Sequence, residues 1–550
     1  MQNASSEGFR KTVGSENGWI NTRSASGSLS RQPWFSRSVG ALLPPGWRLC
    51  VPSFILRRVG LGSETDARLS TMSSDKCPYP SSETPTSEVA VKPVLEFESI
   101  PSPAWRLPVL GDLLSVDSVK PVQKEMVMAS RLGPIFERKI LNHRLTVVSG
   151  VELVAEVNNE ALWAKSVGLP IRKLRAVAED GLFTAFNSEP NWQKAHNILN
   201  AGFSQAALRK YHPSMLRALD GLMASWDAAA AAGGKIDATA DANKLALDVI
   251  GLAGFGYDFA SFDGDEHPFV GAMSRVLEHV NRTSNDIPFL RKLRGNGAEL
   301  QYEKDIAFVR TVVDDVITER QAKQGEHQDD LLDLMLNNID DETGETLDPV
   351  NIRNQVLTFL VAGNETTAGT IAFALYFLSR HPEIADAARA EVADITGGEI
   401  PAFEDVAPMR YLRRVVDETL RLWPSAPGYF RKVRTDTTLG GRYAMPKGSW
   451  VFVLLPQLHR DPVWGEDPDS FDPDRFKPEN VKKRPAHAYR PFGTGPRSCI
   501  GRQFALHEAV LTLATILQRY SFQSDPEYKL DVREALTLKP VGLKLSLQRL

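Results

Sequence analysis

Cys499 is the residue whose surroundings most clearly suggest chemistry. It stands in the stretch PFGTGPRSCIG at 491–501, between glycines and two positions after an arginine, and it is one of three cysteines in 550 residues. The other two, Cys50 and Cys77, lie near the N-terminus, so we expect no disulfide framework. An amphipathic stretch at 501–520 follows and predicts a helix, whose N-terminal N–H groups and macrodipole would favour a thiolate at Cys499.

A thiolate in such a loop is a soft, electron-rich ligand suited to a haem iron. Two other interpretations remain open at this point. A lone cysteine is usually a buried structural residue, and the glycines could belong to a phosphate-binding loop. The phosphate loop is disfavoured, because Ser498 stands at the last glycine position of the GxGxxG pattern and no Lys-Ser or Lys-Thr pair follows.

A second group of suggestive residues lies midway along an apolar stretch at 350–380, which predicts a buried helix about 45 Å long. The segment AGNETT at 362–367 places a glycine, a carboxylate and two hydroxyls in this helix. Threonine hydroxyls can bond back to helix carbonyls and, beside Gly363, open the helix locally. The resulting groove could hold dioxygen and water beside a haem. A packing kink without a chemical role is the alternative.

Two residue pairs have helical spacing and chemical potential. Glu418 and Arg421 are three positions apart in RYLRRVVDETLRLW, so they share a helix face and can form an ion pair. An exposed pair of little energetic weight is the alternative. Trp192 and His196 are four positions apart in NWQKAH, and both can donate a hydrogen bond to one carboxylate. For His196, a surface or core histidine without a ligand is the alternative.

Together these segments resemble the cytochrome P450 family. The pattern Phe492-x-x-Gly495-x-Arg497-x-Cys499-x-Gly501 matches the haem-binding loop of that family at every fixed position. Over 97–550 the chain is most similar to the haem domain of the self-sufficient bacterial fatty-acid hydroxylases, in which that domain is fused to a diflavin reductase. The matching stretches include EDGLFTAF, NWQKAHNIL, ALDVIGLAGFGYDFASF, FALYFL, LRLWPSAP and GRQFALHEA.

The resemblance implies that haem b is the cofactor and that Cys499 is its iron ligand. The other residues expected at the cofactor belong to the haem loop or would hold the haem propionates: Phe492, Gly493 and Gly501 in the loop, and Arg497, Trp192 and His196 at the propionates. The resemblance also implies that Glu418 and Arg421 join Arg475, in FDPDRF, in a buried structural network that supports the loop carrying Cys499.

By the same resemblance, Thr366 and Glu365 are the alcohol and the adjacent acid of the oxygen-activation motif. Thr366 would stabilise bound oxygen, and Glu365 would relay protons through ordered water. Asn364 stands where close relatives often carry histidine.

The substrate pocket implied by the resemblance is apolar, with walls formed by Phe183, Ala362, Ala426 and Leu536. An ordinary core role is the alternative for each of these four. Relatives hold a fatty-acid carboxylate at the channel mouth with a basic residue and a tyrosine. This chain has His143 and Val147 there, with Arg144 adjacent, and this departure puts fatty acids in doubt.

The predicted function is that of a haem-thiolate monooxygenase, which inserts one oxygen atom from O₂ into a C–H bond of an apolar, fatty-acid-like or aromatic substrate. We expect NADPH-derived electrons from a separate diflavin reductase or ferredoxin, because the sequence ends where the haem domain of the relatives ends; a fragment of a reductase fusion is the alternative. A haem-thiolate peroxygenase or isomerase and a non-catalytic haem sensor are the rival functions. The intact Glu365-Thr366 pair argues against both.

The elements that must position these residues are mainly helical. Helical periodicity is clearest at 192–209, 241–255, 302–322, 350–380, 382–396, 407–423 and 502–520, and short strands are expected at 143–149, 443–445, 450–455 and 536–548. These patterns predict a mainly α fold with a small β part. The resemblance makes this the cytochrome P450 fold.

The predicted domain boundaries are a disordered leader at 1–95 and the haem domain at 96–550. Residues 1–71 carry nine Lys and Arg against four Asp and Glu and are rich in serine, which is typical of an organellar transit peptide; a start at Met72 is the alternative. We therefore expect a cytoplasmic protein, or a mitochondrial one if the leader is genuine.

The net charge and the hydropathy of the chain indicate which kinds of partner to expect. The formal net charge of −4 gives no reason to expect nucleic-acid binding. The most apolar early segment, at 41–56, is interrupted by prolines and Arg48, so no transmembrane anchor is expected. We expect a monomer.

Overall fold

The computed structural model describes residues 97–264, 267–284, 297–323 and 328–550. The predicted leader at 1–95, with Cys50, Cys77 and Met72, lies outside these residues. Within them the prediction of a mainly α fold with a small β part is confirmed. The helices are α1 (Pro121–Leu132), α2 (Val151–Val157), α3 (Leu169–Ala178), α4 (Asn191–Asn200), α5 (Gln205–Ala231), α6 (Ala238–Phe255), α7 (Pro268–Ser284), α9 (Gly297–Ala322), α10 (Leu331–Asn337), α11 (Pro349–Arg380), α12 (Pro382–Thr396), α13 (Phe403–Val406), α14 (Arg410–Leu422), α15 (Leu455–Leu458), α16 (Pro478–Lys483) and α17 (Arg502–Arg519).

The strands are short and form several small sheets. They are β1 (Ile135–Ile140), β2 (His143–Val148), β3 (Trp163–Ser166), β4 (Lys235–Asp237), β5 (Gly428–Val433), β6 (Thr437–Leu439), β7 (Tyr443–Met445), β8 (Trp450–Leu454), β9 (Tyr520–Ser524), β10 (Val532–Glu534), β11 (Leu538–Pro540) and β12 (Lys544–Arg549). The largest sheet has the order β1-β2-β8-β5-β3, in which only the pair β2 and β8 is parallel. The hairpin β10–β11 forms a separate sheet.

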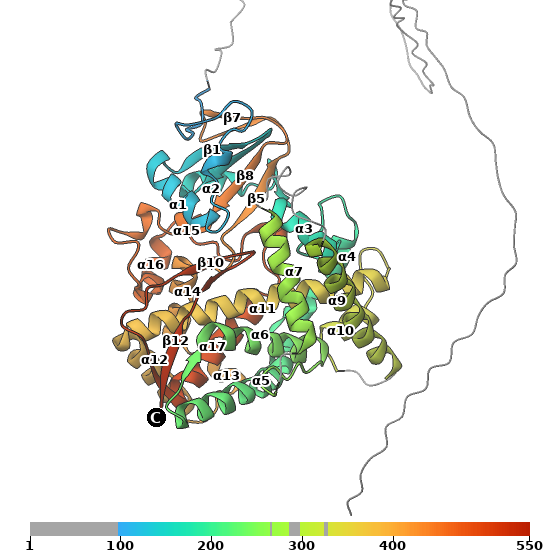
Figure 1. Cartoon of the computed structure of the whole chain (residues 1–550), viewed down its shortest axis with the longest axis vertical. Helices are drawn as coiled ribbons and strands as arrows, with labels where there is room; N and C mark the ends of the chain where they lie inside the picture. Colours follow the sequence, from blue (N-terminus) through green and yellow to red (C-terminus); the bar gives the residue numbers. More distant parts are fainter. Residues whose placement is uncertain (1–96, 265–266, 285–296, 324–327) are drawn as a thin grey trace, which may run out of the picture. The chain divides into compact units, whose positions relative to one another are not determined.

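Helix α11 lies at the centre of the helical part, where α6, α14 and α17 pack against it (Figure 1). Its 32 residues correspond to about 48 Å. The helix begins where the side chain of Asp348 accepts a hydrogen bond from the N–H of Asn351 and Pro349 takes the first position, which needs no N–H donor. Its surface is apolar on most sides, so it can be buried from several directions.

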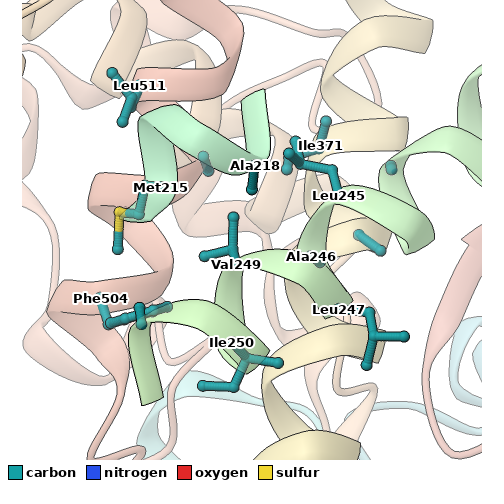
Figure 2. Close-up of a cluster of buried hydrophobic side chains, with 14 of the residues drawn as sticks. Met215, Ala218, Leu245, Ala246, Leu247, Val249, Ile250, Ile371, Phe504 and Leu511 are labelled. Atoms are coloured by element: carbon teal, nitrogen blue, oxygen red, sulfur yellow. The ribbon is translucent and has the colours of Figure 1, made fainter. Parts of the chain in front are cut away.

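The core around α11 is built from side chains of four helices. Figure 2 shows Met215 and Ala218 of α5, Val249 and Ile250 of α6, Ile371 of α11, and Phe504 and Leu511 of α17 close together. All are buried. Removing apolar surface of this extent from water is the main force that fixes the arrangement of these helices.

The predicted elements match the observed ones closely where periodicity is strong. Helix α12 has the predicted bounds of 382–396, and α17 differs from its prediction by one residue. The predicted single helix at 192–209 is wrong, because a 3₁₀ turn at Ala201–Phe203 separates α4 from α5. Ser204, after this turn, is extended and accepts a hydrogen bond from the N–H of Ala207, so it caps the start of α5.

Candidate active site

Cys499 lies in the loop that leads into α17, two residues before Gly501, which caps that helix. Its N–H donates to the carbonyl of Phe492 at 2.9 Å, which closes the loop. Gly493 and Gly495 have φ angles of +71° and +69°, a region that favours glycine. At Gly495 a Cβ would also lie 2.3 Å from Oε1 of Glu160. The glycines therefore determine the shape of the loop that presents the thiol.

The Cys499 side chain is accessible, although it lies deep among protein atoms. Burial raises the pKa of its thiol, and this effect outweighs the N–H of Gly501 and the charge of Arg502, which both act to lower it. The thiolate at this loop stays a prediction, since the N–H of Gly501 and the charge of Arg502 favour the anion and burial opposes it. A positive charge at the sulfur, such as a metal ion, would stabilise the anion further.

Helix α11 is accessible near its middle. Residues 362–366 are half-buried, whereas 354–361 and 367–375 on either side are fully buried. The Thr366 hydroxyl donates to the carbonyl of Ala362 at 2.7 Å, as expected for a threonine that bonds back along the helix. The helix α11 is continuous from Pro349 to Arg380, so the local opening beside Gly363 stays a prediction. Residues 362–366 are accessible because the neighbouring elements do not cover them completely.

A chain of aromatic contacts connects the cysteine loop to α11. A Cβ at Gly501 would lie 3.6 Å from the Phe203 ring. The Phe203 ring lies 5.7 Å from that of Phe359 on α11, centroid to centroid. Helices α17 and α11 also pack directly. The cysteine loop and α11 are thus connected through Phe203 and through the contact between α17 and α11.

Glu365 forms a buried ion pair that the sequence did not predict. Its Oε1 lies 2.7 Å from Nζ of Lys539 on β11, and its Oε2 accepts a hydrogen bond from the Thr537 hydroxyl at 2.9 Å. Burial opposes its charge, but Lys539, Thr537 and Arg533 together lower the pKa of the Glu365 carboxyl. Glu365 is therefore a carboxylate at neutral pH. The signal for this ion pair in the sequence is the stretch LTLKP at 536–540, which has a lysine in a strand that is otherwise mostly apolar.

Three of the residues predicted at the propionates lie together. The Arg497 guanidinium carbon lies 4.2 Å from the centre of the Trp192 ring, and Trp192 stacks on His196 with centroids 5.0 Å apart. Arg497 also donates to the carbonyl of Ala185 at 2.6 Å. Burial lowers the pKa of Arg497 to about 10, and burial together with Arg497 lowers the pKa of His196.

Lys165 on β3 is a functional candidate that sequence reasoning missed. Its Nζ donates to the carbonyl of Phe183 at 2.7 Å, and burial together with the charge of Arg497 depresses its pKa. Lys165, Arg497 and Trp192 line a hollow of about 350 Å³. In the described part of the chain neither cation forms an ion pair, and Nε of Arg497 has no partner there. A lysine in the short segment WAKS gave no signal in the sequence.

Glu418 and Arg421 are fully buried and form a bidentate pair, with distances of 2.6 and 2.7 Å. Arg475 lies in the 3₁₀ turn Pro473–Phe476, with its Nε 3.6 Å from Oε1 of Glu418. The structure therefore brings the three predicted members of the network together. The pair anchors the segment before the cysteine loop, because Arg421 also donates to the carbonyls of His459 and Ser470.

The predicted pocket residues are accessible to different degrees. Ala362, Ala426 and Leu536 are half-buried, and Phe183 is 36% exposed, which fits side chains that line a hollow. At the proposed channel mouth, His143 is exposed at the start of β2. Val147 is buried in an apolar cluster with Phe136 and Leu454, so it offers no polar group to a substrate.

The chain belongs to the cytochrome P450 family. The family model for cytochrome P450 matches residues 101–547. A crystal structure of the cytochrome P450 CYP102L1 is similar with a TM-score of 0.77 and 45% sequence identity, covering 83% of this chain and 100% of that one. The predicted cytochrome P450 fold is confirmed, as is the prediction that the chain is a cytochrome P450 enzyme, an oxidoreductase.

Curated relatives include longer proteins. A bifunctional cytochrome P450/NADPH–P450 reductase of Bacillus cereus is 42% identical over 453 residues, which cover 82% of this chain and 42% of that protein. A protein with the same function in its name, from Bacillus subtilis, is 41% identical over 455 residues, with the same shares covered. A self-sufficient cytochrome P450 monooxygenase of Phanerodontia chrysosporium, CYP505E3, is 37% identical over 448 residues. This chain spans less than half the length of these relatives.

Haem is the cofactor of this family, and the described residues fit it. The accessible Cys499 thiol can supply an iron ligand, and the iron would provide a positive charge that stabilises the thiolate. Lys165 and Arg497 have no ion-pair partner among the described residues and their pKa values are lowered by burial, so the two propionates would supply the negative charge that favours their protonated forms. Among the described residues we find no helix with the length and apolar character that membrane crossing requires.

Proposed function

We propose that this chain binds haem b through Cys499 and inserts one oxygen atom from O₂ into a C–H bond of an apolar substrate. One observation carries the proposal. An accessible cysteine precedes α17, this helix packs on α11, and residues 362–366 of α11 are accessible while their neighbours on both sides are buried. Membership in the cytochrome P450 family supports the same reading.

Each side of the cofactor would be held by different residues. Cys499 is the proposed iron ligand, within the loop that contains Phe492, Gly493 and Gly501. When bound, haem with a thiolate ligand supplies the activation of dioxygen. On the propionate side, Lys165 and Arg497 are the cations, and the Trp192 indole is an N–H donor. His196 supports Trp192 by stacking on its ring.

Thr366 is proposed to orient a polar group in the accessible stretch of α11. Its hydroxyl hydrogen is engaged with the carbonyl of Ala362, so its oxygen is free to accept a hydrogen bond. Donation of a hydrogen bond requires this contact to break. A hydroxyl that can either accept or donate a hydrogen bond is suited to hold a water molecule beside it and to position the proton of that water.

Glu365 is proposed to relay protons toward that place. It is adjacent to Thr366 on the same helix and is a carboxylate at neutral pH, so it can accept a proton from water and return it. Its side chain is 23% exposed in spite of the ion pair with Lys539, which leaves it accessible to water.

The proposed substrate is apolar and lacks a carboxylate. The wall residues Phe183, Ala362, Ala426 and Leu536 offer apolar surface. At the mouth, His143 is exposed at the start of β2, and Val147 offers no hydroxyl. The adjacent Arg144 is exposed, and its pair with Glu137 at 3.0 Å partly neutralises its charge. A fatty alcohol or another neutral lipid-like molecule fits better than a fatty acid.

Electrons are proposed to come from NADPH through a diflavin reductase. The relatives from both Bacillus species carry an NADPH–P450 reductase in their names, which supports this donor over a ferredoxin. We propose that the donor can act as a separate protein.

The first experiment tests the haem-thiolate assignment. We expect the purified, reduced protein to give the carbon monoxide spectrum of a thiolate-ligated haem, and Cys499→Ser to lose it. A wild-type protein that binds haem but gives the spectrum of a histidine-ligated haem would refute the assignment. Arg502→Gln is a matched control, because it removes a nearby charge without removing the ligand.

The second experiment tests substrate and electron source. Dodecanoic acid and 1-dodecanol differ only in the head group, so we compare the spectral shift and the product that each gives with NADPH and a purified diflavin reductase. We expect tighter binding of the alcohol. Equal or tighter binding of the acid would refute the substrate proposal. Product formed with hydrogen peroxide but not with NADPH and reductase would favour a peroxygenase.

A further inference from the structure

The hairpin β10–β11 places a buried lysine against the middle of α11. Lys539 is 7% exposed, and its ammonium group lies 2.7 Å from Oε1 of Glu365. Thr537, two residues earlier, donates to the other carboxylate oxygen at 2.9 Å. Both oxygens of Glu365 are therefore engaged by residues of one short segment.

A glycine allows the hairpin to approach the helix this closely. A Cβ at Gly369, four residues after Glu365, would lie 2.8 Å from the carbonyl oxygen of Leu538 and 3.4 Å from Cγ of Lys539. The N–H of Leu538 donates to the carbonyl of Ser425 at 2.9 Å, which is a second backbone contact that holds β11. The position of Lys539 is thus determined by backbone contacts, in addition to its own charge.

The polar contacts of Lys539 continue to a second helix. Its ammonium group also donates to Oδ1 of Asn243 on α6, and the side-chain amide of Asn243 donates to the carbonyl of Thr239 at 2.8 Å. Asn243 and Thr239 are half-buried near the start of α6. Lys539 therefore has one anionic partner and one neutral partner, and its contact with Glu365 is the only ion pair that it forms among the described residues.

The charges that face Glu365 all favour its ionised form. Lys539 and Arg533 face it from the hairpin, and the groups that face it from α6 and from Thr537 are neutral. Burial acts in the opposite direction. Loss of the lysine charge would leave burial dominant, because a desolvated carboxyl without a cation is protonated more readily.

We propose that Lys539 is a positioning residue for the oxygen-insertion reaction: it holds the Glu365 carboxylate against the hairpin β10–β11 and sets the pH range in which Glu365 can relay protons. This inference rests on the proposed function, because it requires Glu365 to be the relay. A purely structural clamp would predict the same contacts but no link between Lys539 and the pH dependence of turnover.

The first test measures coupling in Lys539→Met, with a purified diflavin reductase, NADPH and 1-dodecanol. We expect the ratio of hydroxylated product to hydrogen peroxide at pH 7 to fall by about ten-fold. We also expect the acidic limb of the pH profile to move to higher pH, because Glu365 becomes protonated there. Lys539→Arg keeps the charge and should restore most of the ratio. Lys544→Met is the matched control, since it removes an exposed lysine of β12, which pairs with Asp237 at 2.8 Å.

The second test does not depend on activity. Infrared difference spectra of the purified protein, recorded for each variant with and without the additional substitution Glu365→Gln, report the protonation of this one carboxyl. We expect the band of a protonated carboxylic acid at pH 7 in Lys539→Met and not in wild type or in Lys539→Arg. Absence of that band in correctly folded Lys539→Met would overturn the proposal.

The double variant separates the two levels of inference. If Lys539 acts through Glu365, Lys539→Met should have no further effect on the product ratio once Glu365→Gln is present. If Glu365→Gln alone leaves the ratio unchanged, the relay role in the proposed function is wrong. If Glu365→Gln lowers the ratio but both Lys539→Met and Lys539→Arg leave it and the pH profile unchanged, only the proposal for Lys539 is wrong. If Lys539→Met does not fold, Lys539→Arg provides the test. A pH profile and an infrared spectrum of Lys539→Arg that show a different protonation of Glu365 from wild type would refute the role of the charge.

Discussion

Removal of Arg421 should destabilise the folded chain more than almost any other single substitution of a charged residue. Its guanidinium donates to both carboxylate oxygens of Glu418 and to three backbone carbonyls, of His459, Pro468 and Ser470, at distances between 2.6 and 2.9 Å. The side chains of Arg421 and Glu418 are both fully buried. Arg421→Met therefore leaves a carboxyl group and three carbonyls in the core without these donors.

The magnitude follows from the cost of an uncompensated buried charge. Breaking a buried ion pair by removal of one partner costs about 3–5 kcal/mol of the free energy of unfolding. Arg475 compensates little, because its Nε is 3.6 Å from Glu418, while Nη2 donates to Ser470 Oγ at 2.9 Å and to the carbonyl of Asp467. The backbone N–H of Asp472 still donates to Oε1 of Glu418 at 2.9 Å. We therefore expect a loss within the stated range.

The assay is urea unfolding of the haem-bound protein, followed by far-ultraviolet circular dichroism at several pH values. Burial already raises the pKa of Glu418, and loss of Arg421 should raise it further. A carboxyl whose pKa is higher in the folded state penalises stability above that pKa, so the deficit of Arg421→Met should shrink as the pH falls. Lys323→Met is the control, because Lys323 and Glu319 are 50% and 65% exposed and an exposed ion pair contributes little to stability. A loss below about 1 kcal/mol for Arg421→Met would refute the reasoning.

Three further predictions follow from the site and the core. Arg497→Gln and Lys165→Met should each speed haem transfer to apomyoglobin by about ten-fold, and unchanged transfer rates in both would argue against propionate contacts. Thr366→Ala should raise hydrogen peroxide at the expense of product, so an unchanged product yield would exclude Thr366 from the reaction. Burial raises the pKa of Asp248 to about 6, so wild-type stability should fall as the pH rises toward that value. Asp248→Asn, which can still accept from Ser261, should remove this decline in urea unfolding.

The sequence was informative where one periodic pattern or one fixed spacing decides the outcome. Helix α12 has its predicted bounds because Pro382 and Gly397 mark its two ends. Glu418 and Arg421 could be paired from their spacing, since residues three apart share a helix face. The burial of that pair could not be read from spacing, because it depends on residues of other segments.

The sequence was less informative where residues far apart in the chain meet. Lys165 and Arg497 are separated by more than 300 positions, and their shared hollow follows from the position of β3 beside the cysteine loop. Lys539 is likewise distant from Glu365 and reaches it because Gly369 admits the strand β11. For Cys499 the sequence shows the favourable helix end, but not the burial that raises the pKa of its thiol.

By itself, the sequence determined the helical framework, the family, and the residue types that can bind iron and transfer protons. Periodicity, capping residues and short motifs act over a few residues, so they are visible in the chain. Only the tertiary structure decided which of these residues are charged, paired or accessible. Burial and Coulomb interactions depend on distances through space, and these arise when α11, α17 and the hairpin β10–β11 pack together.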